Sequence, residues 1–271
     1  MEEQIEACLD LVRRLPPAHI SSHLDSLLSL APLLAEDLLA AIDQPLSLAS
    51  CPSTNKQFIK CDYNRDADSY RSPWSNEYDP PYADGTRPSS SVRALEVQAN
   101  EAFSIYKDLY FDGAGSTVSS VYLWDLDGSG FAAAVLIKKT ADDSKSSWDS
   151  IHVFEVIPVS ASSFHYKLTS TIILYLAMPA HQTTGLRLGG HVTRQSEHSV
   201  HLANTTAAAA ATGHVENMGR IVETAEAGLR ANLHDIYLSK TADIAAALRV
   251  DSRAAGQAKA VQAEILKGMG K

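Results

Sequence analysis

Histidine is the side chain in this sequence with the widest chemical range, and five of the ten histidines fall between residues 181 and 214. His198 and His201 are three residues apart, so a helix would present both imidazoles on one face, as a zinc site can require. No acid or cysteine stands at a spacing that would complete such a site. We therefore interpret His181, His191, His198, His201 and His214 as exposed loop histidines and predict no metal site.

A second candidate is Asp62-x-Asn64-x-Asp66, which imitates the opening of a calcium-binding loop. Ala67 stands where that loop needs a glycine, and Pro73 stands where it needs a bidentate glutamate. The pattern is better explained by carboxylates that cap turns and pair with neighbouring arginines. No calcium site is predicted.

The most specific enzyme signatures are missing from the sequence: it contains no G-x-x-x-x-G-K-[ST], H-E-x-x-H or G-x-S-x-G, and no paired C-x-x-C. The DGSG at 127–130 resembles a phosphate loop, but it joins two expected strands and is typical of a hairpin turn. Cys8, Cys51 and Cys61 have no pairing pattern, which is typical of reduced thiols. We predict no catalytic residue and no cofactor.

Composition narrows the classes of function further. The formal net charge of −9 is the reverse of the basic surface that follows a phosphate backbone, so nucleic-acid binding is disfavoured. No apolar run approaches the roughly 18 to 20 residues that cross a bilayer, and the first residues are acidic, so neither a membrane span nor secretion is expected. With 45% hydrophobic residues, the chain can bury a core of its own.

The elements that would position any site begin as helices. Apolar residues at helical spacing between Ile5 and Leu39 predict three short antiparallel helices punctuated by prolines. Residues 43–91 are rich in proline, acids, serine and aromatics without a sustained period. We expect an irregular but ordered connector there, because aromatics bury large areas and are scarce in disordered segments. Another helix is expected after Pro88.

A period of two then predicts five strands, at 119–126, 131–139, 149–157, 163–176 and 185–195. Their short connections permit only antiparallel neighbours, so a meander is the simplest topology. Residues 196–213 are expected to be a surface loop, and a long helix from Val215 is expected to cover the apolar face of the sheet. Residues 251–271 carry four basic and two acidic side chains and are expected to form a weakly amphipathic binding arm.

Long stretches of the sequence resemble one family. CDYNRDADSYRSPWSNEYDPP, SSVYLWDLD, FAAAVLIKK, WDSIHVFEV, LGGHVTRQ and NMGRIVE occur in this order. They closely resemble the β subunit of the heterodimeric F-actin capping protein, and the likeness runs from about residue 4 to about residue 250. The resemblance implies an α+β fold with an N-terminal antiparallel helical stalk, an irregular middle globule, a five-stranded antiparallel sheet covered by a long helix, and a C-terminal amphipathic tentacle.

The corresponding segments are a stalk at 1–42, a connector globule and helix at 43–112, the sheet at 113–195, a loop and long helix at 196–250, and the tail at 251–271. The resemblance also implies that they fold as one unit with the α subunit, in an obligate heterodimer. That heterodimer caps the barbed end of actin filaments without calcium, in the cytoplasm and at cortical actin structures. Pairing would satisfy an open sheet edge, so we expect the chain alone to be poorly soluble.

The same resemblance implies two sets of site residues. Arg230 matches a family arginine that contributes to the actin-facing patch, and Val261, Ile265 and Leu266 are the tentacle residues that would contact actin. Phosphoinositides are an expected ligand of the heterodimer.

A separate regulatory surface is implied on the stalk. Arg14 and Tyr78 match positions where capping-protein-interaction motif peptides bind in relatives. Two alternatives stay open at this point: a subunit that caps the actin-related filament of a dynactin-like complex, and a hydrolase of unfamiliar type. The second would require convergent acid, base or nucleophile groups, which the sequence does not offer.

Overall fold

The computed structural model describes residues 2–14, 19–111, 115–127, 130–142, 146–160, 162–177, 187–202, 207–235, 246, 256–257 and 260–261. Contacts divide the chain into two compact units, Met1–Arg220 and Ile221–Lys271. The first unit contains the described strands and the first part of the long helix α5 (Ala207–His234), and the second contains the rest of that helix.

Three N-terminal helices pack around a small core of their own. They are α1 (Glu2–Arg14), α2 (Ile20–Leu30) and α3 (Ala35–Ala41), and a 3-10 turn η2 (Pro32–Leu34) precedes α3. Pro32 opens η2, where a missing N–H costs nothing because the first donors of a helix are unpaired. The buried side chains of this core are Val12, Ile20, Leu24, Leu34, Leu38 and Ile42. The predicted helical array is confirmed.

The connector contains short strands that the sequence analysis did not predict. β1 (Ser47–Ser50) pairs with β2 (Gln57–Lys60), and after a 3-10 turn η3 (Asp62–Asn64) a second small sheet joins β3 (Arg65–Asp66), β4 (Ser69–Arg71) and β5 (Tyr78–Asp79). Strands of two to four residues are too short to display a period of two. The expectation of an ordered segment is confirmed, and the expectation that it is irregular throughout is wrong.

Buried polar side chains fasten this connector to the main sheet. The Leu46 N–H donates to Asp149 Oδ2 at 2.9 Å. The Ile59 N–H donates to Ser120 Oγ at 2.9 Å, and the Tyr122 hydroxyl donates to the Ile59 carbonyl at 2.7 Å. Because these groups are buried, each hydrogen bond satisfies a backbone atom that would otherwise be costly to bury. The connector is therefore part of the core and not a linker.

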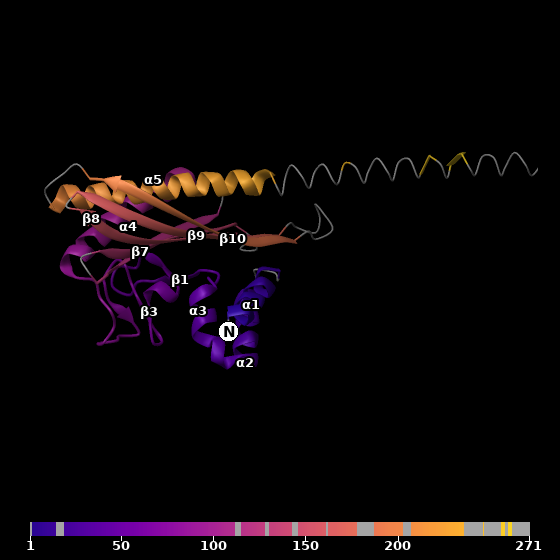
Figure 1. The fold of residues 1–271 in the computed structure, drawn as a ribbon, viewed down its shortest axis with the longest axis horizontal. Helices are drawn as coiled ribbons and strands as arrows, with labels where there is room; N and C mark the ends of the chain where they lie inside the picture. The colour runs from indigo at the N-terminus through magenta and orange to yellow at the C-terminus, as the bar shows by residue number, and fades with distance from the viewer. Residues whose placement is uncertain are drawn as a thin grey trace, which may run out of the picture. The chain divides into compact units, whose positions relative to one another are not determined.

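The main sheet is a five-stranded antiparallel meander, as predicted. Its order is β10-β9-β8-β7-β6 (Figure 1), with strands β6 (Ser116–Asp125), β7 (Phe131–Thr140), β8 (Ser147–Ser160), β9 (Ser163–Ala177) and β10 (Arg187–His201). The helix α4 (Ser90–Tyr110) packs along β6 and buries Leu95, Ala99 and Phe103. This meander leaves β6 and β10 as its two outer strands.

The prediction of a surface loop at 196–213 is wrong. β10 continues to His201, and α5 begins at Ala207, earlier than the predicted Val215. The end of β10 was missed because its exposed side chains are polar and do not alternate with apolar ones. The start of α5 was missed although alanine has the highest helix propensity. The sheet therefore extends beyond the boundary predicted at residue 195.

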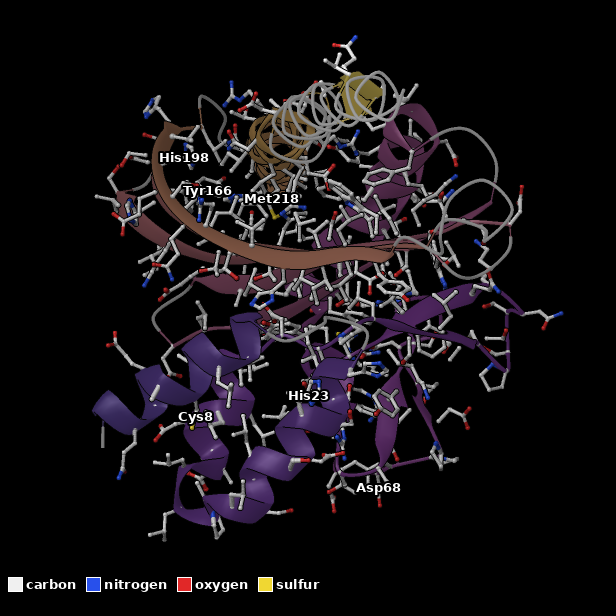
Figure 2. All side chains as sticks on the ribbon, turned by 90° about the vertical axis from the view of Figure 1, so that its right-hand side faces the viewer. Cys8, His23, Asp68, Tyr166, His198 and Met218 are labelled. Carbon is white, nitrogen blue, oxygen red and sulfur yellow. The ribbon has the colours of Figure 1, made fainter. Side chains whose placement is uncertain are left out.

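The first part of α5 packs on the sheet through an aromatic cluster. The His214 ring meets Phe131 and Phe164 edge to face, at centroid distances of 5.1 and 4.6 Å, and its Nδ1 lies 2.7 Å from the Tyr166 hydroxyl. Figure 2 shows Met218, which is fully buried, on the side of the helix that faces the sheet. Burial lowers the pKa of His214 to about 4. This histidine is therefore a neutral core residue near neutral pH.

Candidate protein-interaction sites

Tyr78 lies in the wall of a groove between the connector and β6. The groove has a volume of about 280 Å³, and its lining includes Asp62, Tyr63, Asp66, Tyr78, Leu123 and Trp124; we call it the Tyr78 groove. The Tyr78 side chain is only 6% exposed, and its hydroxyl donates to Asp66 Oδ2 at 2.5 Å. The tyrosine predicted on an accessible surface is thus held rigidly, with little of its own area open to a ligand.

The fixed position of Tyr78 has clear local causes. A Cβ added to Gly85 would lie 2.4 Å from the Tyr78 ring, so only glycine lets the chain pass this close. Asp66 also accepts the Thr86 N–H at 2.7 Å. Burial raises the pKa of Asp66, but the hydrogen bonds from Tyr78 and Thr86 outweigh it and leave the pKa below its ordinary value. Asp66 is therefore an anion at physiological pH.

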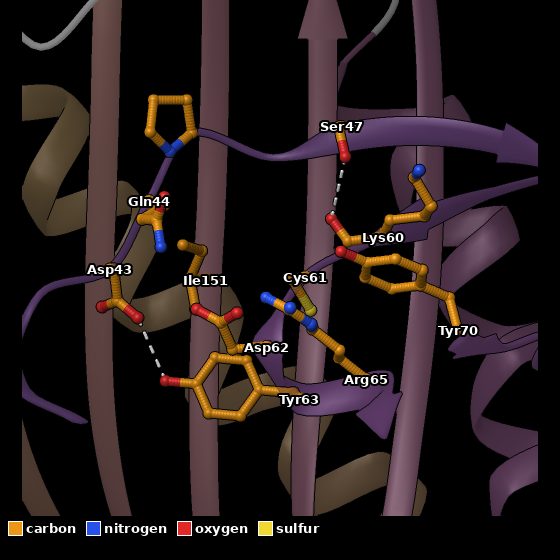
Figure 3. A pocket seen from close by; sticks show the side chains of 11 residues that line it. Asp43, Gln44, Ser47, Lys60, Cys61, Asp62, Tyr63, Arg65, Tyr70 and Ile151 are labelled. Carbon is orange, nitrogen blue, oxygen red and sulfur yellow. Dashed lines mark hydrogen bonds between the residues drawn. The ribbon is translucent and has the colours of Figure 1, made fainter. Parts of the chain in front are cut away.

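A second groove adjoins the first and shares Asp62, Tyr63 and Arg65 with it (Figure 3). Its volume is about 130 Å³, and Asp43, Gln44, Lys60 and Tyr70 complete its polar rim; we call it the Asp43 groove. The Tyr63 hydroxyl donates to Asp43 Oδ1 at 3.0 Å. Burial, followed by the charge of Asp43, raises the pKa of Tyr63, so the phenol stays neutral.

Together the two grooves offer carboxylates and aromatic rings but no arrangement for catalysis. Asp43, Asp62 and Asp66 supply negative charge, and Tyr63 stacks with Trp124 at a centroid distance of 6.3 Å. No nucleophile in their lining lies next to a general base. Lys60, Arg65 and Arg71 line the same grooves, so positive and negative charges are balanced there. Such a surface suits an extended peptide that has charged side chains of both signs and apolar stems.

The outer strand β10 presents backbone groups to solvent. Asn100, on α4, bonds both the N–H and the C=O of Val121, so these groups point away from β7. Hydrogen-bonded and non-bonded pairs alternate in antiparallel strands. The backbone of Arg194 therefore points inward, to β9. The pairs that connect it with Val121 across the sheet are Val121↔Val135, Val135↔His152, His152↔Ser170 and Ser170↔Arg194.

The neighbours of Arg194 consequently point outward. Thr193 and Gln195 face away from β9, and the Thr193 carbonyl accepts a bond from the Arg194 guanidinium at 3.1 Å. Among the residues that the structure describes, none bonds the N–H of Gln195 or Glu197. This edge is therefore able to pair with another strand.

Arg230 lies on α5 and is bound within its own helix. Its Nη2 donates to Glu226 Oε2 at 2.9 Å, one helical turn away. The Glu226 side chain is 2% exposed and that of Arg230 is 35% exposed. The guanidinium thus neutralises a buried carboxylate while it keeps part of its surface in solvent. Sequence reasoning missed Glu226, although an acid four residues before an arginine is a recognised helical pair.

The other residues implied by the family resemblance are only partly described. Val261 is 56% exposed, which is compatible with contact to another molecule. Ile265 and Leu266 lie outside the described residues, and so does the side chain of Arg14, whose backbone ends α1.

The histidines and acids do not assemble into the sites that were considered. His198 and His201 lie on β10 and not on a helix, so their spacing points them to opposite faces of the sheet. His214 is buried, which corrects its interpretation as an exposed loop residue, and His181 lies outside the described residues. Within the described part of the chain, no three His, Cys, Asp or Glu side chains are placed to hold a metal ion.

The Asp62-x-Asn64-x-Asp66 pattern has a structural role. Asn64 is buried, accepts the Cys61 N–H at 2.9 Å and donates to the Arg71 carbonyl at 2.8 Å. Its amide therefore orders η3. Among the described helices, none is both long enough and apolar enough to cross a membrane.

The arrangement of helices and strands has a counterpart among solved structures. The structure is similar to "homodimeric actin capping protein alpha subunit from Plasmodium berghei", with a TM-score of 0.53. The match covers 92% of this chain and 96% of the other, at 15% sequence identity. An identity this low shows a shared fold.

Sequence comparison gives the family. Residues 5–245 match the family model for the F-actin capping protein, beta subunit. The F-actin-capping protein subunit beta of Caenorhabditis elegans is 48% identical over 92% of this chain and 89% of its own length. The Drosophila melanogaster protein of the same name is 47% identical over 94% of this chain and 91% of its own length. The chain belongs to the F-actin capping protein β-subunit family.

Proposed function

We propose that this chain pairs with a capping protein α subunit and that the heterodimer blocks the barbed end of actin filaments, without calcium. Membership of the β-subunit family carries the proposal. The open edge of β10 supports the pairing, because a second subunit of the same fold could continue the sheet there. The similar Plasmodium berghei protein is described as a homodimer, which is in keeping with a fold that associates with another copy of itself.

On the filament, Arg230 contributes positive charge to the actin-facing surface. Its guanidinium is partly exposed although Glu226 holds one edge of it. Charge of this kind mainly speeds encounter, whereas the apolar tail residues Val261, Ile265 and Leu266 would mainly slow release. Because the charge would speed encounter and the tail would slow release, the protein should associate with the actin cytoskeleton, including cortical structures.

Barbed-end elongation from filament seeds tests the function. The full-length chain, co-expressed with its α subunit, should stop growth, and a chain truncated after Val250 should cap but dissociate faster. Equal dissociation of the two would remove the tail from the mechanism. Failure of both to cap would overturn the actin proposal and favour another filament, such as the actin-related one of a dynactin-like complex.

Arg230 is tested in the same assay across a range of salt concentrations. Arg230→Ala alone would remove a charge partner of the buried Glu226 carboxylate, so the informative variant is Arg230→Ala combined with Glu226→Gln. We expect weaker capping with a smaller salt dependence, and Arg230→Lys should retain most of the activity. Arg220→Ala, on the same helix, is the matched control. Unchanged salt dependence in the double variant would remove Arg230 from the surface.

The Tyr78 groove and the Asp43 groove are the proposed binding surface for capping-protein-interaction motif regulators. Asp43 and Asp62 would attract basic residues of the peptide, and Tyr78 would form the wall. Arg14, whose side chain lies outside the described residues, is the second position proposed to contact these peptides. Asp62→Asn should weaken binding of a motif peptide, as measured by fluorescence anisotropy. Asp68→Asn removes an exposed charge outside both grooves and should have no effect. A phosphoinositide effect on capping would be a separate property, tested with lipid vesicles.

A further inference from the structure

The two outer strands of the main sheet differ in what covers their backbone. On β10 no described residue bonds the outward N–H groups of Gln195 and Glu197, whereas β6 presents Val121 and Leu123 to side chains of α4 and the connector. A strand whose outward groups are already bonded cannot pair with another strand without first losing those bonds.

Asn100 imitates a neighbouring strand at Val121. Its Nδ2 donates to the Val121 carbonyl at 2.8 Å, and its Oδ1 accepts the Val121 N–H at 2.9 Å. A side-chain amide carries the same donor and acceptor as a peptide group, so it can replace both ladder bonds of one residue. Asn100 is 2% exposed, which leaves water little access to these bonds.

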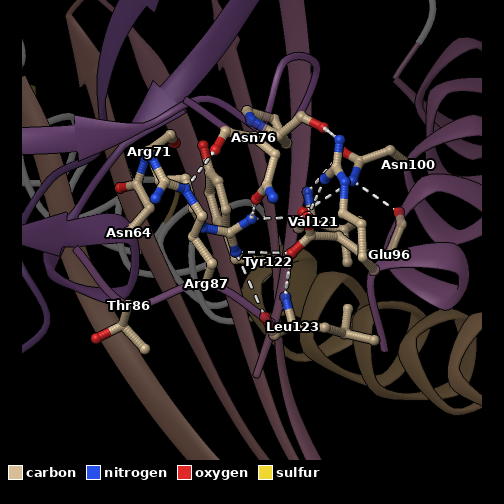
Figure 4. A network of polar contacts seen from close by, with 12 residues as sticks. Asn64, Arg71, Asn76, Thr86, Arg87, Glu96, Asn100, Val121, Tyr122 and Leu123 are labelled. Carbon is tan, nitrogen blue, oxygen red and sulfur yellow. Dashed lines mark hydrogen bonds and ion pairs between the residues drawn. The ribbon is translucent and has the colours of Figure 1, made fainter. Parts of the chain in front are cut away.

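Glu96 and Arg71 do the same at Leu123, two residues further along β6. The Leu123 N–H donates to Glu96 Oε2 at 2.6 Å, and Arg71 Nη2 lies 3.4 Å from the Leu123 carbonyl. Arg71 also binds both oxygens of Glu96, at 2.8 and 2.7 Å, and Arg93 adds a further bond to Glu96. Figure 4 shows this network across α4, β6 and the connector.

The chemistry of this network argues for a role in specificity. The Arg71 and Glu96 side chains are 4% and 0% exposed, and a buried ion pair is often no more stabilising than apolar residues of the same volume. Apolar residues, however, would leave the N–H and C=O groups of β6 unpaired. Charged and amide groups are needed because they are the ones that can occupy backbone donors and acceptors.

We propose that Arg71, Glu96 and Asn100 form an edge clamp that closes the sheet at β6, so that it can be extended only at β10. This rests on the proposed pairing with an α subunit at β10. With this edge closed, further heterodimers cannot add edge to edge through β6.

The test opens the edge in the intact heterodimer. Asn100→Leu keeps the approximate size of the side chain but removes both bonds to Val121. We expect sedimentation velocity to show concentration-dependent association of heterodimers, at least about tenfold stronger than in the wild type. Hydrogen exchange at the Val121 amide should accelerate about tenfold or more, as loss of one hydrogen bond implies, while Leu123 stays protected by Glu96. Gln98→Leu, the same change two residues away on α4, should alter neither.

Two results would overturn the clamp. One is a variant whose Val121 amide exchanges faster but which still sediments as a single heterodimer, because the opened edge then recruits nothing. The other is unchanged exchange at Val121. If Asn100→Leu does not fold, Asn100→Ser, whose smaller polar side chain cannot reach both groups of Val121, is judged by the same two measurements. Failure of the proposed pairing is distinguishable, because the wild-type chain itself would then form no one-to-one complex with α.

Discussion

The two outer strands of the main sheet differ in whether their outward backbone groups are hydrogen-bonded. On β6 the outward N–H groups of Val121 and Leu123 are bonded by Asn100 and Glu96, whereas the N–H groups of Gln195 and Glu197 on β10 are unbonded among the described residues. Both strands are long, so length does not explain the difference. What differs is the neighbouring element. The helix α4, which has buried polar side chains, lies along β6, whereas no described side chain bonds the N–H groups of Gln195 and Glu197 on β10.

The largest effect is expected from breaking the closed edge at Arg71. Arg71→Met would keep the apolar stem but leave Glu96 with less of its compensating charge. Removing one partner of a buried ion pair costs about 3–5 kcal/mol, so the heterodimer should unfold at clearly lower denaturant concentration. Chemical denaturation followed by circular dichroism measures this.

The matched control for that experiment is Arg87→Ala. Arg87 pairs with Glu77 at 3.2 Å, but both side chains are exposed, and such pairs contribute about 0–1 kcal/mol. Equal losses for the two variants would show that the Arg71–Glu96 pair is no more important than a surface contact, and the contrast between the two edges would lose its energetic basis.

A substitution at Gln195 tests whether the open edge of β10 pairs with α. Gln195→Pro removes an outward N–H without touching the ladder to β9, a place where edge strands tolerate proline. A partner carbonyl left unbonded costs about 1–3 kcal/mol, so pairing with α should weaken by about tenfold to a hundredfold. Gln195→Ala keeps the N–H and should pair normally. Titration of tagged α subunit against each variant decides, and normal pairing by the proline variant would place the interface elsewhere.

A pH experiment distinguishes the two sides of the sheet. His214 contacts Phe164 and Tyr166 of β9, next to the open edge, and burial lowers its pKa to about 4. The unfolded chain binds a proton below about pH 6.5 and the folded chain only near pH 4, so stability is lost as pH falls through this window. Between pH 7 and 5 the loss from this group should be about 1–2 kcal/mol.

The measurement compares wild type with His214→Gln, which cannot titrate, and with His201→Gln, which changes an exposed ring. Stability should fall more steeply with acid in the wild type and in His201→Gln than in His214→Gln. Hydrogen exchange should show earlier opening at β9 than at β6. Identical pH profiles for the three proteins would contradict a role for His214.

The predictable parts of this fold are those whose pattern is local. Alternation along 163–176 was sufficient for β9, a continuous apolar run at 131–137 for β7, and helical spacing for α4. The edge clamp could not be predicted, because Asn100 and Val121 are 21 residues apart and Arg71 and Glu96 are 25 apart, with no periodic signal to connect them. An asparagine and a glutamate on the inner face of a helix look like defects in its apolar stripe until the strand beside them is known.

The candidate sites divide along the same line. Family resemblance pointed to Tyr78 and Arg230. It did not point to the Tyr78 groove and the Asp43 groove, or to the buried Glu226 that binds Arg230. Those features depend on η3 folding against β6 and on which face of α5 is buried. Neither the packing of η3 nor the buried face of α5 can be predicted from the residue types alone. Enzyme motifs are local patterns, so their absence can be recognised in the sequence itself.

The smallest effect is expected at the end of the closed edge. Asp125, the last residue of β6, accepts the Ser89 N–H at 2.7 Å and its hydroxyl at 2.6 Å, which fixes the residue that caps α4. These hydrogen bonds hold the pKa of Asp125 below its ordinary value, so their contribution is present above about pH 4 and is lost as pH falls further. Asp125→Asn should cost about 0.5–1 kcal/mol, the usual range for a weakened helix cap, and should remove that acid dependence. Asp127→Asn, two residues along the chain, is the control. If the two variants are equally stable, Asp125 does not help to hold α4 on β6, and the closed edge begins at Leu123 and not at the end of the strand.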